Sequence, residues 1–339
     1  MNIAIHHTEE SFSDYWIEYC KSNAISFKVV NCYDNDIVTQ LQDCDALMWH
    51  HHHGVYKDTL FAKSLLFSLE QAGVKVFPDL NTAWHFDDKI GQKYLLEAIN
   101  APLVPSHVFY DKKQAMVWAE QTTFPKVFKL RGGAGALNVK LVKSKKEALK
   151  LIKKAFGKGF KTFDGIYYFK DCIKKYRGKS IGKKKLIKAL GRVFIAPSDS
   201  KEFPRERGYV YFQDFIPNND CDYRVIIIEN KAIAIKRMVR KDDFRASGSG
   251  SFVYEIENFS EDIIQLAFNT AKKMKSQSCA FDFIYDSNNI PLIVEVSYGF
   301  ASSGYDACPG YWDENIVFHR AEVNPYNWIV EELIKQISE

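Results

Sequence analysis

The sequence has no apolar run long enough to cross a membrane and no cysteine pattern typical of a disulfide framework. None of its hydrophobic stretches approaches the roughly 20 residues that a membrane-spanning helix needs. Its seven cysteines are odd in number and scattered, without a C-x-x-C pair, which argues against a disulfide-rich secreted domain and against a zinc knuckle. The first residues lack the basic-then-apolar order of a signal peptide. We therefore expect a cytoplasmic protein.

Strong charge bias and low-complexity composition are also missing. The 339 residues include only 18 glycines and 10 prolines, and the net charge is +4. Hydrophobic residues make up 46% of the chain and charged residues 26%, values near the average of globular proteins, which exclude wholesale disorder. A chain of this length should form two or three domains.

The N-terminal part alternates between strand-like and helix-like segments. We expect strands at Asn2–His6, Phe27–Asn31, Ala46–Trp49 and Val74–Phe77, and helices at Ser11–Lys21 and Thr59–Ala72. This alternation predicts a small α/β sheet with parallel pairing. Four consecutive histidines, 50–53, directly follow one strand. Because adjacent strand residues point to opposite faces, they cannot all reach one metal ion, and we interpret them as a polar strand end at a domain interface.

The rest of the chain is predicted to be mixed helix and strand. We expect helices at Asp88–Ile99, Lys113–Gln121 and Lys145–Phe156. Strands are expected at Ser106–Tyr110, Lys126–Leu130, Asn138–Val142, Val210–Phe212, Tyr223–Ile228, Ala232–Lys236, Phe252–Glu255, Ala280–Ile284 and Leu292–Val296. Between these groups lies a basic segment. Residues 150–207 contain 18 Lys and Arg against 5 Asp and Glu, a local net charge of +13.

Three glycines, Gly132, Gly133 and Gly135, lie between the strands expected at Lys126–Leu130 and Asn138–Val142. Glycine packs nothing and costs backbone entropy, so the stretch calls for a reason. Backbone N–H groups in such a loop can cradle a phosphate, and an ordinary hairpin loop would also use glycine. The stretch alone leaves both readings open.

Two predicted hairpins carry clustered charges. A four-residue loop at Ser287–Ile290 would place Asp282 opposite Glu295, with Ser297 on the same face. Cross-strand carboxylates need a shared proton or a cation between them, and hard oxygen ligands favour magnesium. An exposed edge with both acids in water is the alternative.

The second hairpin has a two-residue turn at 229–230. It would set Asp222 opposite Arg237, with Arg224 on the same face and Arg245 in the loop that follows. Arginine is suited to gripping phosphate or carboxylate through two hydrogen bonds. A surface ladder of solvated charges is the alternative reading.

From Asp88 onward the chain resembles the ATP-grasp superfamily, and most closely its RimK-like branch, the ribosomal-protein glutamate ligase type. Five stretches carry the resemblance over roughly 210 residues: DKIGQKYLL, FPKVFKLRGGAGALNV, VYFQDFIPNNDCDYRVIII, AIKRMVRKDDFRAS and AFDFIYDSNNIPLIVEVS. The implied fold is α/β (α+β), an ATP-grasp fold with an N-terminal pre-ATP-grasp domain and a basic insertion. The implied domains are residues 1–87 (pre-ATP-grasp), 88–153 (N-terminal lobe with the glycine-rich lid), 154–207 (basic insertion) and 208–339 (C-terminal lobe with the metal site).

The resemblance also implies roles for individual residues. Nucleotide-binding residues would be Lys89, Lys129, Gly132, Gly133, Gly135, Gln213, Asp214, Phe215, Ile216 and Asp222, with residues 213–216 reading adenine through the backbone and the glycines covering the triphosphate. Metal ligands would be Asp282, Glu295 and Ser297, and the catalytic arginines would be Arg224, Arg237 and Arg245. Ser297 departs from the family, which usually has Asn there. The implied cofactors are ATP and Mg²⁺, with Mn²⁺ as an alternative metal.

The implied activity is an ATP-dependent, ADP-forming ligase that joins a carboxylate to an amine through an acyl phosphate. The partners we expect are an amine or amino acid and an acidic, carboxylate-bearing glycan, glycolipid or peptide, with peripheral membrane contact. Polysaccharide biosynthesis would follow from a glycan substrate, and we take the aromatic segment after Ser297 as a candidate acceptor-binding wall. One alternative is an ATP-grasp protein that phosphorylates a hydroxyl or only binds nucleotide. A second is a nucleic-acid-binding protein that uses the basic segment, which lacks any known recognition signature.

Overall fold

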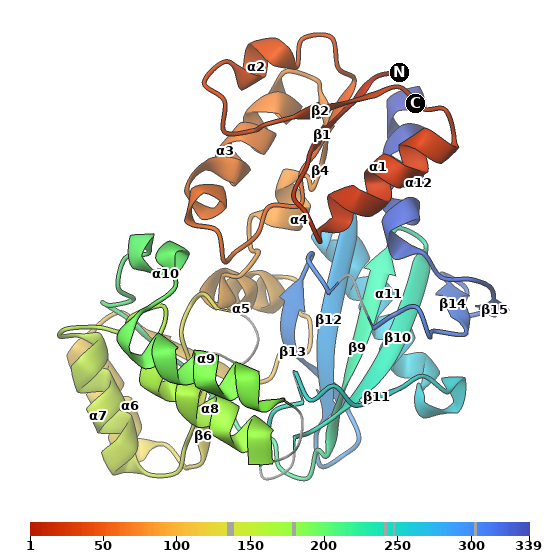
Figure 1. Ribbon diagram of the computed structural model, residues 1–339. Coiled ribbons are helices and arrows are strands. Elements are labelled where there is room, and N and C mark those ends of the chain that lie inside the picture. The colour runs from red at the N-terminus through yellow and green to blue at the C-terminus, as the bar shows by residue number, and fades with distance from the viewer. Residues whose placement is uncertain (134–138, 178–180, 241–242, 247, 302–303) are drawn as a thin grey trace.

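The computed structural model describes the chain except residues 134–138, 178–180, 241–242, 247 and 302–303 (Figure 1). The secondary structure forms three sheets with helices packed against them. No helix among the described residues combines the length and apolar character needed to cross a membrane.

The N-terminal unit is a four-stranded parallel sheet, as predicted. Its strand order is β2-β1-β3-β4, with β1 at Ile3–His6, β2 at Phe27–Val30, β3 at Ala46–Met48 and β4 at Lys75–Phe77. The helices of this unit are α1 (Phe12–Ser22), α2 (Ile37–Gln40), α3 (Tyr56–Gln71) and α4 (Leu80–Ala83). Residues on its two faces enter different cores, because successive side chains of a strand point in opposite directions: Ile3 and Ile5 enter one and Ala4 the other.

A second sheet is antiparallel and lies in the middle of the chain. Its order is β5-β8-β6-β7, with β5 at Ser106–Phe109, β6 at Lys126–Lys129, β7 at Lys140–Val142 and β8 at Val210–Asp214. The associated helices are α5 (Lys89–Ala98), α6 (Lys112–Gln121) and α7 (Lys145–Ala155). Since β8 pairs with β5 and β6, the chain returns to this sheet after the basic segment.

The described residues of the basic segment form three helices between β7 and β8 of this sheet. They are α8 (Gly165–Arg177), α9 (Lys183–Phe194) and α10 (Ser198–Glu202). Helices α8 and α9 lie side by side as a hairpin on the outside of the molecule (Figure 1). Charge alone did not predict these helices from the sequence.

The third sheet is the largest, with the order β13-β12-β9-β10-β14-β15 and β11 paired to β10. The strands are β9 (Cys221–Ile228), β10 (Lys231–Met238), β11 (Phe252–Val253), β12 (Ser278–Tyr285), β13 (Pro291–Ser297), β14 (Gly310–Asp313) and β15 (Phe318–Arg320). A short 3-10 turn (Ile256–Asn258) and helices α11 (Glu261–Met274) and α12 (Pro325–Ser338) complete the fold.

The alternation of side chains along β9 divides the two faces of this sheet. Val225 and Ile227 pack with α11 in one core. Ile226 and Ile228 pack with the N-terminal unit and α12 in another. Asp222 and Arg224 have the same parity as Ile226, so the polar half of this face continues directly from its apolar half.

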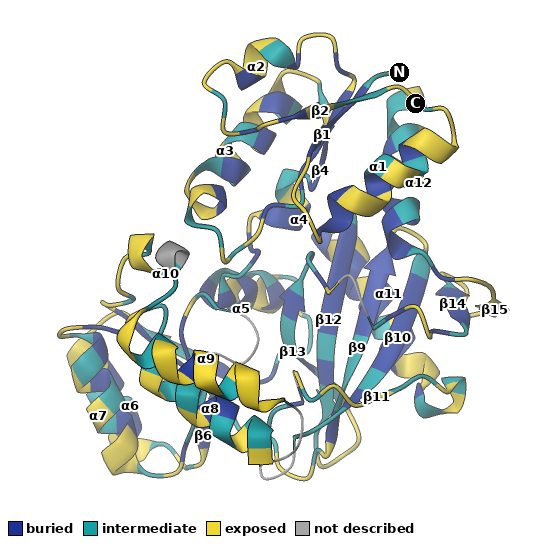
Figure 2. Cartoon of the chain, viewed as in Figure 1, coloured by how far each residue is buried: buried dark blue, intermediate teal, exposed yellow. Residues whose placement is uncertain are grey.

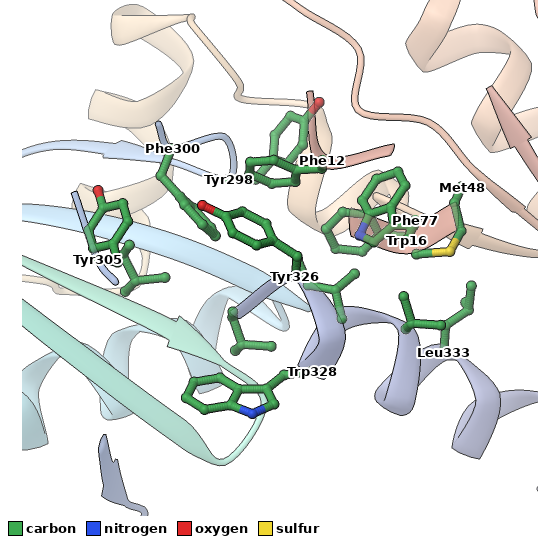
Figure 3. Close-up of a cluster of buried hydrophobic side chains, with 14 of the residues drawn as sticks. Phe12, Trp16, Met48, Phe77, Tyr298, Phe300, Tyr305, Tyr326, Trp328 and Leu333 are labelled. Carbon is green, nitrogen blue, oxygen red and sulfur yellow. The ribbon is translucent and has the colours of Figure 1, made fainter. Parts of the chain in front are cut away.

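One aromatic core joins the two ends of the chain. Figure 3 shows Phe12 and Trp16 of α1 and Phe77 of β4 in the same cluster as Tyr326 and Leu333 of α12. This core therefore crosses the boundary predicted at residue 87. Figure 2 shows the buried strands beneath the more exposed outer helices.

Candidate active site

A cavity of about 550 Å³ lies where all three sheets approach one another. Thirteen residues predicted from the sequence line it: Lys89, Lys129, Gly133, Gln213, Asp214, Phe215, Ile216, Asp222, Arg224, Arg245, Asp282, Glu295 and Ser297. Arg237 is buried behind the wall, at 5% exposure. Gly132 is outside the lining, and Gly135 falls outside the described residues. The structure thus gathers residues from all five of the stretches that carry the resemblance.

Asp282 and Glu295 face one another because two differences from the predicted hairpin cancel. The predicted loop at Ser287–Ile290 is wrong by one residue, since Tyr285 pairs with Pro291. A register shift between Asp282 and Phe283 then leaves an extra residue in β13. Asp282 consequently faces Glu295, as predicted, through a β-bulge. Bulges are common beside functional sites because they re-aim a side chain.

Two arginines hold Asp282 in place and compensate its charge, so repulsion from Glu295 does not dominate at this position. Arg224 donates from Nε and Nη2 to the two oxygens of Asp282 at 2.6 and 2.8 Å. Arg237 Nη2 lies 2.8 Å from Asp282 Oδ2. Burial would raise the pKa of Asp282, but the two arginines outweigh it and hold that pKa well below its usual range. The sequence predicted that the facing carboxylates need a shared proton or a cation between them, but it did not reveal that two arginines already compensate Asp282.

Asp222 completes an alternating cluster of two acids and two arginines. Arg237 donates to both oxygens of Asp222, at 2.6 and 2.7 Å. Asp222 and Arg237 face one another across β9 and β10, as predicted from the two-residue turn. Arg224 and Asp282 face one another across β9 and β12, a pairing that the sequence did not reveal. The cluster has no net charge, and Arg237 forms its inner support.

Glu295 is paired with a buried lysine. Lys89 Nζ lies 3.0 Å from Glu295 Oε1 and donates to the carbonyl oxygen of Gly133 at 2.9 Å. Burial opposes the ammonium charge, but Glu295 and Asp87 outweigh it and raise the pKa of Lys89. Burial would also raise the pKa of Glu295, and Lys89 and Lys129 lower it overall. Glu295 is therefore a stable anion on the cavity wall.

The glycine stretch is anchored by an acid that sequence reasoning missed. The backbone N–H of Gly133 donates to both carboxylate oxygens of Asp87, at 2.9 and 2.8 Å. Burial raises the pKa of Asp87 to about 6. Gly133 has a φ of +111°, a conformation that side chains rarely adopt. An added Cβ at Gly132 would lie 3.0 Å from Asp87 Oδ2. Both glycines therefore meet local requirements of this loop.

Lys129 is a second buried cation on the wall. Its Nζ donates to Gln213 Oε1 at 2.7 Å, and the amide of Gln213 donates in turn to Ser106 Oγ at 3.2 Å. Burial lowers the pKa of Lys129 to about 8. A further negative charge would stabilise its protonated form, since opposite charges favour ionisation.

Strand β8 ends where the predicted nucleotide hinge begins. Asp214 accepts hydrogen bonds from Lys126 Nζ at 2.7 Å and from His107 Nε2 at 2.9 Å, so its side chain is fixed within the middle sheet. Phe215 and Ile216 follow the last paired residue of β8 and line the cavity.

Arg245 connects the cavity to the basic helices. It pairs with Asp243 at 2.6 Å and with Asp171 of α8 at 2.9 Å, and it donates to Tyr167 Oη at 2.9 Å. Asp171 also pairs with Arg240 at 3.1 Å. Asp171 and Tyr167 were missed in the sequence because the segment around them was read only by its charge.

The donor set of the hairpin fits magnesium by its chemistry. Asp282, Glu295 and Ser297 offer two ionised carboxylates and a hydroxyl oxygen on one cavity face. Ser297 Oγ donates its hydrogen to the carbonyl oxygen of Gly299 at 2.6 Å. The lone pairs of Oγ are therefore not used in this hydrogen bond. Within the described part of the chain, no three His, Cys, Asp or Glu residues form a metal-binding group. Magnesium commonly uses one or two carboxylates with substrate phosphates, so this set suits a metal bound with its nucleotide.

The histidine run lies at the junction of the N-terminal unit with the large sheet, as predicted. His50 stacks on Phe12 with ring centroids 3.8 Å apart, and Ser11 Oγ lies 2.8 Å from its Nδ1. Tyr298 Oη donates to the carbonyl of His51 at 2.6 Å. Burial lowers the pKa of His50 and of His53 to about 3. These histidines are neutral, and three of them line the far end of the cavity: His50, His52 and His53.

The predicted acceptor wall after Ser297 is mostly core. Tyr305, Tyr326 and Trp328 are buried in the core that the N-terminal unit shares with α12, as Figure 3 shows. Trp312 is buried in the other core of the large sheet, with α11. Among the described residues after Tyr298, the segment 299–301 reaches the cavity. Aromatic composition alone could not distinguish a packing segment from a sugar-stacking surface.

Comparison with protein families gives a match over part of the chain. Residues 205–309 match the RimK-like ATP-grasp domain. This span contains β9, β10, β12 and β13 and therefore all four members of the acid–arginine cluster. No curated protein matches the chain significantly.

Comparison with solved structures covers the whole chain. D-alanine–D-alanine ligase from Bacillus anthracis is similar with a TM-score of 0.55 and 15% identity, over 100% of this chain and 97% of that one. A RimK domain ATP-grasp protein from Sphaerobacter thermophilus gives 0.52 and 13%, over 87% and 90%. The ATP-grasp ligase PsnB, solved with precursor peptide PsnA2 and AMPPNP, gives 0.54 and 12%, over 100% and 98%. The resemblance and the fold class predicted from the five stretches are confirmed.

Proposed function

We propose that this chain, which has the ATP-grasp fold and carries a RimK-like ATP-grasp domain, is an ATP-dependent ligase that joins a carboxylate to an amine. The observation that carries the proposal is the composition of one cavity. Lys89 and Lys129 lie buried on its wall. Beside them are the ionised Glu295 and Asp282, whose charge is compensated by arginines. Such a wall suits a triphosphate with a divalent cation.

The nucleotide would occupy the part of the cavity between the middle sheet and the large sheet. The adenine would lie against Phe215 and Ile216, where β8 ends. Lys89, Lys129 and Gly133 would hold the phosphates, and Asp222 would lie toward the ribose. Asp282, Glu295 and Ser297 would hold Mg²⁺, which when bound would neutralise phosphate charge. The solved Bacillus anthracis ligase and PsnB contain ATP, and magnesium with ADP, respectively.

The chemistry follows from positions and charges in the remaining part of the cavity. The substrate carboxylate attacks the γ-phosphorus of ATP, and ADP leaves with the electrons of the broken bond. The amine then attacks the carbonyl carbon of the acyl phosphate, loses a proton, and inorganic phosphate departs. Arg224 and Arg245 would stabilise the charge that develops on the transferred phosphoryl oxygens, while Arg237 would hold Asp222 and Asp282 in place. Positioning and charge neutralisation supply most of the rate in such transfers.

The acceptor would bind at the end lined by the N-terminal unit. Ser11, His50, His52 and His53 supply neutral hydrogen-bonding groups there, beside Phe300. Neighbouring structures are named for D-alanine and for a precursor peptide. We therefore favour an amino acid or peptide as a substrate over the glycan that the sequence suggested, because the aromatic side chains expected to stack on sugars are in the core.

A phosphate-release screen tests this proposal. Purified protein, ATP and Mg²⁺ are combined with a matrix of carboxylates and amines, and inorganic phosphate and ADP are measured. A ligase releases phosphate only when both an amine and a carboxylate are present. Phosphate transfer to a hydroxyl without release would assign the protein to the kinase alternative, and ATP binding without turnover would assign a nucleotide-binding role. Glu295→Gln should abolish release in any pair that is active.

A further inference from the structure

Helix α9 exposes apolar side chains in a continuous row. Ile187, Leu190 and Phe194 are 70%, 47% and 83% exposed. Their spacing of three and four residues puts them on one side of the helix. Single exposed apolar residues are ordinary, but a row of them marks an interaction surface. Figure 2 shows α9 as largely exposed on the outside of the molecule.

Two more exposed apolar residues lie at the C-terminal end of α9. Ile195 directly follows α9 and is 67% exposed, and Ile166 at the start of α8 is 59% exposed. Gly165 packs against the backbone of Arg192 and Val193, so Ile166 lies at the same end of the hairpin as Phe194. We call these five side chains the apolar ridge: Ile166, Ile187, Leu190, Phe194 and Ile195.

Basic side chains accompany the ridge on the same helix. Helix α9 contains Lys183, Lys184, Lys185, Lys188 and Arg192 and no acidic residue. Lys183, Lys184, Lys185 and Lys188 are exposed. On the opposite edge of α9, Ala189 is fully buried against the hairpin, so the helix is anchored by one side and presents the ridge on another. The combination of apolar ridge and flanking lysines has the pattern of a helix that lies in a membrane interface.

We propose that α9 docks this protein on an anionic membrane surface. The apolar ridge would enter the boundary between headgroups and acyl chains, while the lysines would extend their ammonium groups to lipid phosphates. A second copy of the chain fits less well, because a two-fold contact through the ridge would bring lysines against lysines. A bilayer also requires no groove, and α9 lines neither of the two cavities described in this structure, of about 550 and 460 Å³. This inference does not depend on the proposed ligase activity.

Co-sedimentation with vesicles tests the docking. Full-length protein is mixed with vesicles of phosphatidylcholine alone, or with about one third phosphatidylglycerol to supply anionic lipid, and the bound fraction is measured. Binding should require the anionic lipid and weaken as salt is added. Phe194→Ser should reduce partitioning about tenfold, and combining it with Ile187→Ser and Leu190→Ser should abolish it. Lys184→Gln and Lys188→Gln should each cost about fivefold.

Matched controls keep the test specific. Leu60 on α3 is 65% exposed, so Leu60→Ser removes a similar apolar side chain elsewhere and should leave vesicle binding unchanged. Lys112→Gln and Lys113→Gln do the same for exposed lysines on α6. All these positions are solvent-exposed, and circular dichroism should show unchanged folding.

Three results would overturn the proposal. The first is equal binding of wild type and the triple serine variant to anionic vesicles. The second is no vesicle binding together with a dimer, detected by analytical ultracentrifugation, that Phe194→Ser dissociates. The third is binding to poly-glutamate without binding to vesicles, which would assign the ridge to an acidic polypeptide partner.

Discussion

Replacing Asp282 with asparagine should destabilise the whole fold as well as stop turnover. Asp282 neutralises Arg224 and Arg237, and the side chains of these three residues are 13%, 19% and 6% exposed. Removing one charge from a buried ion pair typically costs 3–5 kcal/mol, because the partner charge is left uncompensated. Asparagine keeps the shape and one acceptor oxygen, so we expect a loss near the lower end, about 3 kcal/mol.

Urea unfolding measures this loss. With a slope of about 3 kcal/mol per molar urea, the midpoint should fall by about 1 M. Glu295→Gln is the matched control, because its own side chain is 31% exposed and Asp87, 3.8 Å from Lys89 Nζ, still compensates the buried lysine. It should cost about 1 kcal/mol, or roughly 0.3 M. Phosphate release should be lost in both variants. Glu295→Gln should therefore lose activity with little loss of stability, whereas Asp282→Asn should lose both.

A double variant decides whether uncompensated charge is the cause. Asp282→Asn with Arg224→Gln leaves Arg237 paired with Asp222 and restores a neutral cluster. The double variant should therefore unfold at a higher urea concentration than Asp282→Asn alone. The reasoning is refuted if Asp282→Asn and the wild type unfold at the same urea concentration, or if adding Arg224→Gln lowers the urea midpoint further.

Three other substitutions probe the nucleotide site. ATP affinity, measured by calorimetry, should decline above pH 8, since burial lowers the pKa of Lys129 to about 8 and only the protonated form attracts phosphate; Lys129→Arg should stay charged and keep the affinity level up to about pH 9.5. Gly133→Val should raise the KM for ATP by roughly tenfold or more, because a β-branched residue is strained at a φ of +111°, and unchanged kinetics would make the stretch a plain loop. Ser297→Asn supplies an amide oxygen beside Glu295 and should tighten magnesium binding in a titration with activity kept or raised; loss of activity would instead indicate that the Ser297 hydroxyl has another role, such as contact with the acceptor.

Local patterns predicted the strands and their facing residues well. The Asp222–Arg237 pair follows from a two-residue turn and a period of two. The Asp282–Glu295 pair was predicted correctly although the loop was not, because a bulge at this hairpin offsets the error. Elements that were judged only by their composition were not predicted. Helix α11 was not predicted, although its buried residues Ile263, Ile264, Ala267, Phe268 and Ala271 show helical spacing.

Contacts between distant strands could not be read from the sequence. The bond between Arg224 and Asp282 joins residues 58 positions apart, and it depends on β12 lying beside β9. Predicting two opposed carboxylates without these arginines gave the wrong electrostatics. The burial of Tyr326 and Trp328 likewise depends on packing with the N-terminal unit and the large sheet, which no local pattern describes.

The shared aromatic core has a consequence for synthesis on the ribosome. Phe12, Trp16 and Phe77 are translated more than 250 residues before Val330 and Leu333, which pack in the same core. The nascent N-terminal unit therefore carries an incomplete core until the C-terminal helix emerges. Helix α1 packs against α12, although the two helices are far apart in the order of translation. Emergence of α12 from the ribosomal tunnel, more than the completion of any earlier segment, therefore sets the moment at which this core can close.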